Sequence, residues 1–147
     1  MTRVDFYILP EAGLDARHNF ACRLVEKMYR LSQDVCVLTP NAQQCSDFGQ
    51  RLWAYNPTSF IPHRCRTDEQ SESHEQTDKV WVTHGDELLQ HHNVLVNLSC
   101  EQPVHFSRFE RLLEVVVPDK DVVQASRQRY RFYQERGYPI ANHDMRR

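Results

Sequence analysis

The side chains best suited to catalysis in this sequence are cysteines and histidines that stand close together. His63 precedes Cys65 and Cys100 precedes His105, so either pair could supply a thiol nucleophile and its base. A chain with 5 cysteines and 8 histidines contains such pairs by chance, and the GxSxG turn of serine hydrolases is absent. The segment His84 to Glu87 (HGDE) follows an expected strand, where α/β enzymes place catalytic groups, but a turn with exposed charges explains it more simply. We therefore assign no catalytic residue.

Metal and nucleotide sites are not indicated either. The cysteines have no CxxC spacing, no HExxH motif is present, and the adjacent His91 and His92 point in different directions on a helix or a strand. The segment PEAGLDARHN after the first expected strand has one glycine where a GxGxxG loop has three, and no GKS or GKT triplet occurs. We predict no metal and no cofactor. The alternative function is a nucleotide- or small-molecule-dependent enzyme with its site at the carboxyl ends of the strands.

A row of cationic and aromatic groups lies on the last predicted helix, residues 119–136. Tyr130 and Arg131 each stand about one helical turn after Arg127, at the border of the apolar face. Two guanidinium groups beside a phenol suit a peptide that carries acidic residues, a terminal carboxylate and an apolar anchor. A solvated helix face is the other interpretation. Arg129 falls inside the apolar sector, so its guanidinium must extend to solvent or pair with a carboxylate.

A second candidate binding segment runs from Leu52 to His63 and reads LWAYNPTSFIPH. Its rigid groups are Trp53, Tyr55, Phe60, Pro57 and Pro62. Large apolar side chains in a turn stiffened by prolines either pack on the protein's own core or form a surface for a partner. Residue types alone favour the core for Trp53, because a tryptophan at the end of an amphipathic helix is usually buried.

Short apolar segments alternate with helical patterns along the chain. We expect strands at residues 4–9, 35–38, 80–83, 94–98 and 114–117, and helices at 14–31, 40–53, 106–113 and 119–136. This order predicts a doubly wound α/β fold, with a mainly parallel five-stranded sheet and helices on both faces. The fold is Rossmann-like but without nucleotide motifs. We expect a single domain over residues 1–147, with an exposed polar loop at 64–79.

Helical spacing predicts which side chains face the sheet. In the first helix these are Leu14, His18, Ala21, Leu24, Val25, Met28 and Leu31. In the second they are Ala42, Cys45, Phe48, Leu52 and Trp53. In the last they are Val122, Ala125, Phe132 and Tyr133, with Gly137 ending the helix.

Composition indicates a globular protein with one core. The 147 residues are 40% apolar, and no segment approaches the roughly 20 consecutive apolar residues that a membrane helix needs. The odd number of cysteines argues against a disulfide framework, so we expect them to be reduced and mostly buried. The amino-terminal residues lack the features of a signal peptide, and we expect a cytoplasmic protein that does not contact membranes.

Charge is unevenly distributed although the net charge is only -2. Residues 67–92 contain seven acidic residues against one lysine, a local charge of -6. Residues 119–147 contain seven basic residues against four acidic ones, a local charge of +3. A locally basic end in a slightly acidic chain suits a discrete anionic ligand better than a long nucleic-acid backbone, which normally requires a basic domain.

The two candidate binding segments carry a resemblance to a known family. The block LWAYNPTSFIPH after a strand–helix unit, RQRYRFYQERGYPI near the end, and FYIL at the start together resemble the chi subunit of bacterial DNA polymerase III holoenzyme, an accessory of the clamp-loader complex. The resemblance spans the whole chain. It implies a doubly wound α/β fold without nucleotide motifs, in agreement with the missing glycines.

The resemblance implies a non-catalytic bridge between two partners. One is the psi subunit, bound as a 1:1 heterodimer through Phe60, Trp53 and Pro62; a repair helicase is a further possible partner at that surface. The other is the acidic C-terminal tail of single-stranded DNA-binding protein, which ends in apolar residues and a free carboxylate. The residues implied for tail binding are Arg127, Tyr130, Arg131, Val117 and Gly137. DNA itself would be contacted only through the partner.

Physical chemistry sets the strength expected of such tail binding. One or two anchors and a few screened charges correspond to micromolar affinity, about -7 to -8 kcal/mol, and salt should weaken it. The competing classes are the enzyme named above and direct binding of single-stranded DNA by arginine and tyrosine stacking.

Overall fold

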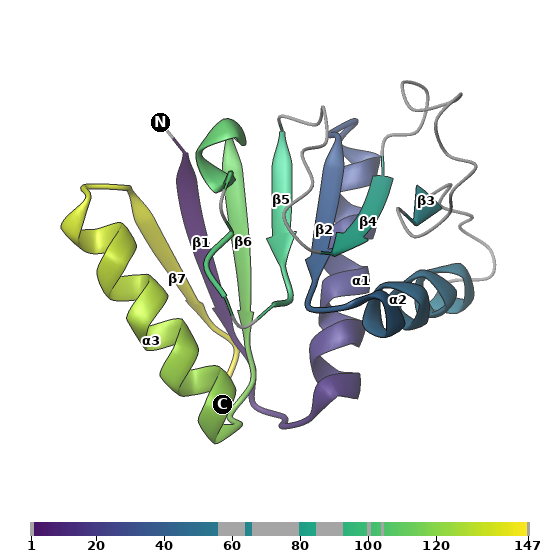
Figure 1. Ribbon diagram of the computed structural model, residues 1–147, viewed down its shortest axis with the longest axis horizontal. Coiled ribbons are helices and arrows are strands. Elements are labelled where there is room, and N and C mark those ends of the chain that lie inside the picture. The colour runs from purple at the N-terminus through teal and green to yellow at the C-terminus, as the bar shows by residue number, and fades with distance from the viewer. Residues whose placement is uncertain are drawn as a thin grey trace.

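The computed structural model describes residues 2–55, 64–65, 80–84, 93–99, 101–103 and 105–146, with only the backbone described at 64–65. The described chain forms one sheet of seven strands in the order β3-β4-β2-β5-β6-β1-β7. The strands are β1 (Arg3–Ile8), β2 (Val35–Thr39), β3 (Arg64–Cys65), β4 (Val80–His84), β5 (Val94–Asn97), β6 (Arg111–Val116) and β7 (Ile140–Asp144). Every pair of neighbouring strands is parallel, so all carboxyl ends lie along one edge (Figure 1).

Three α-helices cover the sheet, and they do so from both faces. Helices α1 (Leu14–Arg30) and α2 (Ala42–Tyr55) share one core with one set of alternating strand side chains. Helix α3 (Lys120–Glu135) packs through Tyr133 into a second core on the opposite face. Figure 1 shows α3 beside β7 and β1, at the other end of the sheet from α2.

The structure confirms the predicted doubly wound α/β fold, with two strands more than the five expected. Arg64–Cys65 pairs with β4 as β3, so the expected loop does not begin at Arg64; residues 66–79 lie outside the described residues. Ile140–Asp144 forms β7 at the edge of the sheet, paired with β1. This strand was missed because Ala, Asn and Asp are uncommon in strands.

The helix predicted over residues 106–113 is wrong. Phe106–Arg108 forms only a 3-10 turn, η2, and Arg111–Val116 is strand β6. Strand β6 pairs with β1 on one side and β5 on the other, and both of its faces are buried. A strand in this position is apolar or β-branched at almost every residue, as the run from Leu112 onward is.

Several expected inward residues are exposed at helix ends. Leu14 and Leu31 expose 47% and 58% of their surface, because they lie where α1 begins and just past its end. Ala42 is exposed in the first turn of α2. Trp53 exposes 44%, because Cys45, Phe48 and Leu52 already fill the inward stripe of α2. The expectation that Trp53 is a core residue is therefore wrong.

Arg17 ties α1 to the carboxyl ends of two strands. Its guanidinium is buried and donates to the carbonyl oxygens of Val115 in β6 (3.0 Å) and Leu98 just after β5 (3.0 Å). A cation that satisfies backbone acceptors at this edge fixes the helix against the sheet.

Three cysteines behave as buried apolar residues. Cys22, Cys36 and Cys45 are buried, and burial raises the pKa of the Cys22 and Cys36 thiols to about 12. These two thiols are therefore protonated at neutral pH and unreactive. Within the described ranges, no helix is both long and apolar enough to cross a membrane.

Candidate functional site

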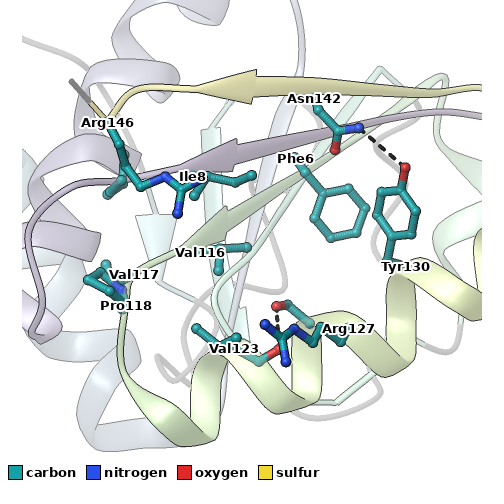
Figure 2. A pocket seen from close by; sticks show the side chains of 12 residues that line it. Phe6, Ile8, Val116, Val117, Pro118, Val123, Arg127, Tyr130, Asn142 and Arg146 are labelled. Atoms are coloured by element: carbon teal, nitrogen blue, oxygen red, sulfur yellow. Dashed lines mark hydrogen bonds between the residues drawn. The ribbon is translucent and has the colours of Figure 1, made fainter.

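A pocket of about 420 Å³ opens between the sheet and α3, at the carboxyl ends of β1 and β6. Its walls come from these two strands and the residues that follow them, from α3, and from β7 with the residues after it. Its lining consists of Phe6, Ile8, Leu9, Val116, Val117, Pro118, Val123, Ser126, Arg127, Tyr130, Asn142 and Arg146 (Figure 2). Most of the lining is aliphatic or aromatic, and its two cations stand on separate elements.

The topology explains why a hollow forms here. The chain leaves β1 toward α1 on one face of the sheet, and leaves the neighbouring β6 toward α3 on the other face. The two connections diverge, which leaves a crevice outside the carboxyl ends of the strands. This is the position at which doubly wound proteins bind ligands.

Tyr130 forms one wall and is held from two sides. Its ring packs on Phe6 with 5.1 Å between centroids, and its hydroxyl accepts a hydrogen bond from Asn142 Nδ2 at 3.2 Å. Figure 2 shows the two rings together beside the hollow. A positioned aromatic wall next to aliphatic side chains is suited to an apolar or aromatic ligand group.

Arg127 supplies positive charge on the α3 side of the pocket. Its side chain is exposed, and among the described residues it has no ion pair or hydrogen-bond acceptor. Its guanidinium therefore retains its donors for an anion, and a carboxylate can accept two of them in parallel.

Arg129, two residues further along α3, is engaged in the core. Its Nε and Nη2 donate to Glu114 Oε2 (3.0 Å) and Oε1 (3.1 Å), and the carboxylate is fully buried in β6. The Tyr133 hydroxyl donates to Glu114 Oε2 at 3.0 Å, and Asn97 Nδ2 donates to Oε1 at 3.1 Å. Burial, and then the Glu114 charge, raise the pKa of Tyr133 far above its usual range. Of the two outcomes expected for Arg129, extension to solvent or a carboxylate partner, the structure has the second. The network sets the rotation of α3, which directs Arg127 and Tyr130 to the pocket.

Strand β7 is fixed by a second buried carboxylate. Asp5 in β1 has a fully buried side chain, contacted by Arg111 Nη2 at 2.9 Å and His143 Nε2 at 3.1 Å. Burial alone would raise the pKa of Asp5, but hydrogen bonds from His143 and Arg111 outweigh it and lower the pKa. The His143 ring stacks on Tyr7 with 4.5 Å between centroids. These contacts place β7, with Asn142, along the pocket.

A carboxylate of the chain itself occupies the beginning of α1. Asp119 Oδ2 accepts a hydrogen bond at 3.1 Å from the backbone N–H of Gly13, which precedes the helix in a left-handed conformation (φ 102°). In dinucleotide-binding proteins the helix after the first strand directs its N-terminal N–H groups at phosphate. Here Asp119 takes up one of these donors and places a negative charge where a phosphate would lie.

The structure brings together three of the five residues expected to bind the tail. Arg127, Tyr130 and Val117 line the pocket. Arg131 is exposed on α3 outside the lining, and Gly137 (φ 80°) ends the helix away from it.

Sequence reasoning missed the strand side of the pocket. Phe6 and Ile8 face α3 because alternate residues of β1 point to that side, a pattern already present in FYIL. Asn142 and Arg146 belong to β7 and the residues after it, and this segment carries little signal in the sequence.

The other candidate surface is described only in part. Trp53 lies exposed near the end of α2, whereas Phe60 and Pro62 lie outside the described residues. Tyr55 lines a shallower hollow of about 320 Å³ with Phe20 and Arg23 of α1. Of the other groups considered for catalysis or metal binding, His84 ends β4, while His63, Cys100, His91 and His92 lie outside the described residues.

Fold and pocket together define a class: a doubly wound α/β protein with an apolar, cationic hollow at the switch point of its sheet. Comparison with known proteins then gives the family. The family described as DNA polymerase III chi subunit, HolC, matches residues 1–141. The chain is 37% identical to the DNA polymerase III subunit chi of Pseudomonas aeruginosa over 147 residues, which is 100% of this chain and 99% of the relative. It is 25% identical to the subunit of that name from Haemophilus influenzae over 141 residues, 96% of each chain.

The chain therefore belongs to the family of DNA polymerase III chi subunits, and its role is an accessory one in DNA replication. This confirms the resemblance drawn from the two sequence blocks.

Proposed function

We propose that the protein is a non-catalytic bridge in the replication machinery. The pocket beside α3 binds the acidic C-terminal tail of single-stranded DNA-binding protein, and the surface around Trp53 binds the psi subunit, which connects it to the clamp loader. The observation that carries the proposal is the exposed Arg127 guanidinium beside a tyrosine-walled apolar pocket.

The pocket has the chemistry that such a tail requires. A volume of about 420 Å³ falls within the roughly 300–1,000 Å³ of small-ligand sites, so it accepts an apolar residue but not a folded domain. Aliphatic side chains and the rings of Phe6 and Tyr130 surround that residue. Arg127 is placed to bind its terminal carboxylate, and Arg131 on the exposed face of α3 attracts acidic residues further up the tail.

The enzyme alternative receives little support from the same pocket. The described lining offers two guanidinium groups, a phenol, a serine hydroxyl and an amide, but no carboxylate, imidazole or thiol to act as a base or nucleophile. The serine hydroxyl, on Ser126, donates to the backbone oxygen of Val123 at 2.9 Å. Asp119 at the beginning of α1 opposes phosphate binding there.

Exposure of Trp53 supports the psi-facing surface. Burying a half-exposed tryptophan against a partner removes a large apolar area from water, and such residues dominate the energetics of interfaces. Phe60 and Pro62 follow Trp53 closely in the sequence, so we assign all three to this surface.

Titration of a labelled synthetic tail peptide, acidic and ending in an aromatic residue with a free carboxylate, tests tail binding. We expect a micromolar Kd that rises with salt, and Arg127→Ala to raise it about 10- to 100-fold, because a charge-assisted bidentate contact is lost. Arg136→Ala is a matched control, because Arg136 lies on Phe132 (4.3 Å) outside the pocket lining. Equal Kd values for Arg127→Ala and the wild type would refute the proposed site.

The two surfaces should be separable. Trp53→Ala should weaken psi binding by at least tenfold and leave the tail-peptide Kd unchanged, since hot-spot tryptophans contribute about 2 kcal/mol or more. Unchanged psi binding would remove Trp53 from the interface. A bare single-stranded oligonucleotide should not bind at the peptide's working concentration; tight binding would favour direct DNA recognition instead.

A further inference from the structure

We propose that Arg146 is a second anion-binding residue of the pocket and that it determines which anionic peptides bind there. The inference rests on the proposed tail-binding function and adds a requirement to it. The ligand must carry negative charge on both sides of its apolar anchor, one charge for Arg127 and another for Arg146.

The backbone holds Arg146 at the pocket even though the residue lies beyond the last strand. The N–H of Met145 donates to the Ile8 carbonyl oxygen at 2.8 Å, which continues the pairing of β7 with β1 past Asp144. Ile8 itself lines the pocket. Arg146 therefore starts from a fixed point on the strand side, and Figure 2 shows its side chain extending from there toward the hollow.

Arg146 and Arg127 stand on different walls. Arg127 comes from α3, Arg146 from the residues after β7, and both line the same cavity. Figure 2 shows the side chains of Ile8 and Val116 in the region between the two guanidinium groups. A ligand whose apolar side chain covers these aliphatic groups has one cation on each flank.

The chain holds the Arg146 guanidinium ready for an anion. Nε and Nη2 donate to Asp144 Oδ1 (2.9 Å) and Oδ2 (2.8 Å), and the backbone N–H of Arg146 donates to Oδ1 at 3.0 Å. Nη1 has no acceptor among the described residues. Because Asp144 holds Nε and Nη2, the guanidinium is already oriented with Nη1 available to a ligand. Less side-chain entropy is therefore lost on binding.

The ion pair does not bury either group. The side chains of Arg146 and Asp144 are 60% and 50% exposed, and exposed pairs of this kind contribute little to folding. Arg146 is therefore poorly explained as a stabilising residue, and its charge can be removed without unfolding the protein. This makes it a suitable position for a binding test.

The experiment compares Arg146→Gln with Arg108→Gln. Each removes one positive charge from an exposed arginine. Arg108, however, lies in η2 just before β6, at the amino ends of the strands, whereas the pocket lies at their carboxyl ends. The tail peptide is titrated at several salt concentrations, and the melting temperature of each variant is recorded. We expect Arg146→Gln to raise the Kd about three- to fivefold with a flatter salt dependence, because one screened contact is lost. Arg108→Gln should match the wild type, and Arg146→Lys should restore most of the affinity.

Each other outcome identifies what fails. If Arg146→Gln binds like the wild type while Arg127→Ala is impaired, Arg146 is not part of the site and the proposed function stands. Equal weakening by Arg108→Gln and Arg146→Gln would assign the effect to net charge and overturn the inference. If Arg127→Ala also binds normally, the tail-binding function itself fails.

Discussion

Helix α3 places two arginines in opposite situations only two residues apart. Arg129 is buried and donates to both carboxylate oxygens of Glu114. Arg127 is exposed beside a pocket and has no ion pair within the described chain. The buried region around Glu114 fixes the helix. The open region around Arg127 leaves donors unsatisfied. Side-chain type therefore says little about role; burial and the available partner decide whether a cation stabilises the fold or binds a ligand.

The largest expected effect comes from breaking the buried region. Glu114→Gln removes the buried negative charge that faces the Arg129 guanidinium, which should lower the free energy of unfolding by about 3–5 kcal/mol. Urea denaturation measures it. Glu135→Gln, on the exposed face of α3, is the control and should change stability by less than about 0.5 kcal/mol. A small loss in Glu114→Gln would mean that the network does not hold the helix.

A buried histidine on the other face of the sheet extends the comparison. His18 in α1 is buried, its Nε2 has no hydrogen bond, and burial, with Arg51 and Arg17 nearby, lowers its pKa to about 4. The native state therefore binds fewer protons than the unfolded state between about pH 6.5 and 4, so His18 makes stability fall as the pH falls through this range.

The substitution His18→Phe removes that titration and retains a ring against Phe48, whose centroid lies 5.4 Å away. The wild type should lose about 2–4 kcal/mol more than the variant between pH 7 and pH 4. Chemical denaturation at the two pH values gives the difference, and equal losses would show that the pKa of His18 is the same in the native and the unfolded state.

One substitution, Tyr→Phe, compares the two regions of α3 directly. In the buried region, Tyr133→Phe deletes the hydroxyl that donates to Glu114 at 3.0 Å and should cost about 1–2 kcal/mol of stability. The measurement is again urea denaturation. A cost near zero would show that Glu114 is satisfied by Arg129 and Asn97 alone.

The smallest effect is expected in the open region. Tyr130→Phe deletes an exposed hydrogen bond of 3.2 Å with Asn142 and should change stability by less than about 0.5 kcal/mol, while the ring still packs on Phe6. Tail-peptide affinity should change less than twofold. A large fall in stability would show that Tyr130 contributes to the core as Tyr133 does.

The sequence was sufficient for those features that depend on local pattern. Runs of apolar residues located five strands, and 3.6-residue periodicity located α1, α2 and α3 with the stop at Gly137. The position of Arg129 within an apolar sector left two expectations, extension to solvent or pairing with a carboxylate, and pairing with Glu114 is the one found. The family resemblance implied five residues for tail binding, and the fold gathers three of them, Arg127, Tyr130 and Val117, at one pocket.

The features that were missed or wrongly predicted depend on contacts between residues distant in sequence. Strand β7 is stabilised by pairing with β1 and by the contact between His143 and Asp5, 138 residues apart, so its own residues carry no strand pattern. Residues 106–113 have helical spacing, but from Arg111 onward the chain pairs with β1 on one side and β5 on the other. Trp53 is exposed because other side chains of α2 fill the space between the helix and the sheet. Periodicity alone does not show which of several apolar side chains near a helix end is buried.

A double-mutant cycle measures whether the Arg127 guanidinium binds the terminal carboxylate of the tail. Tail-peptide Kd values are measured for the wild type and Arg127→Ala, each with the free-acid peptide and with a peptide amidated at its C-terminus. If the Arg127 guanidinium binds the terminal carboxylate, the two changes share one interaction and should show a coupling energy of about 1.5–3 kcal/mol. Amidation would then have little further effect on Arg127→Ala. Additive effects, with a coupling energy near zero, would show that Arg127 does not contact the carboxylate.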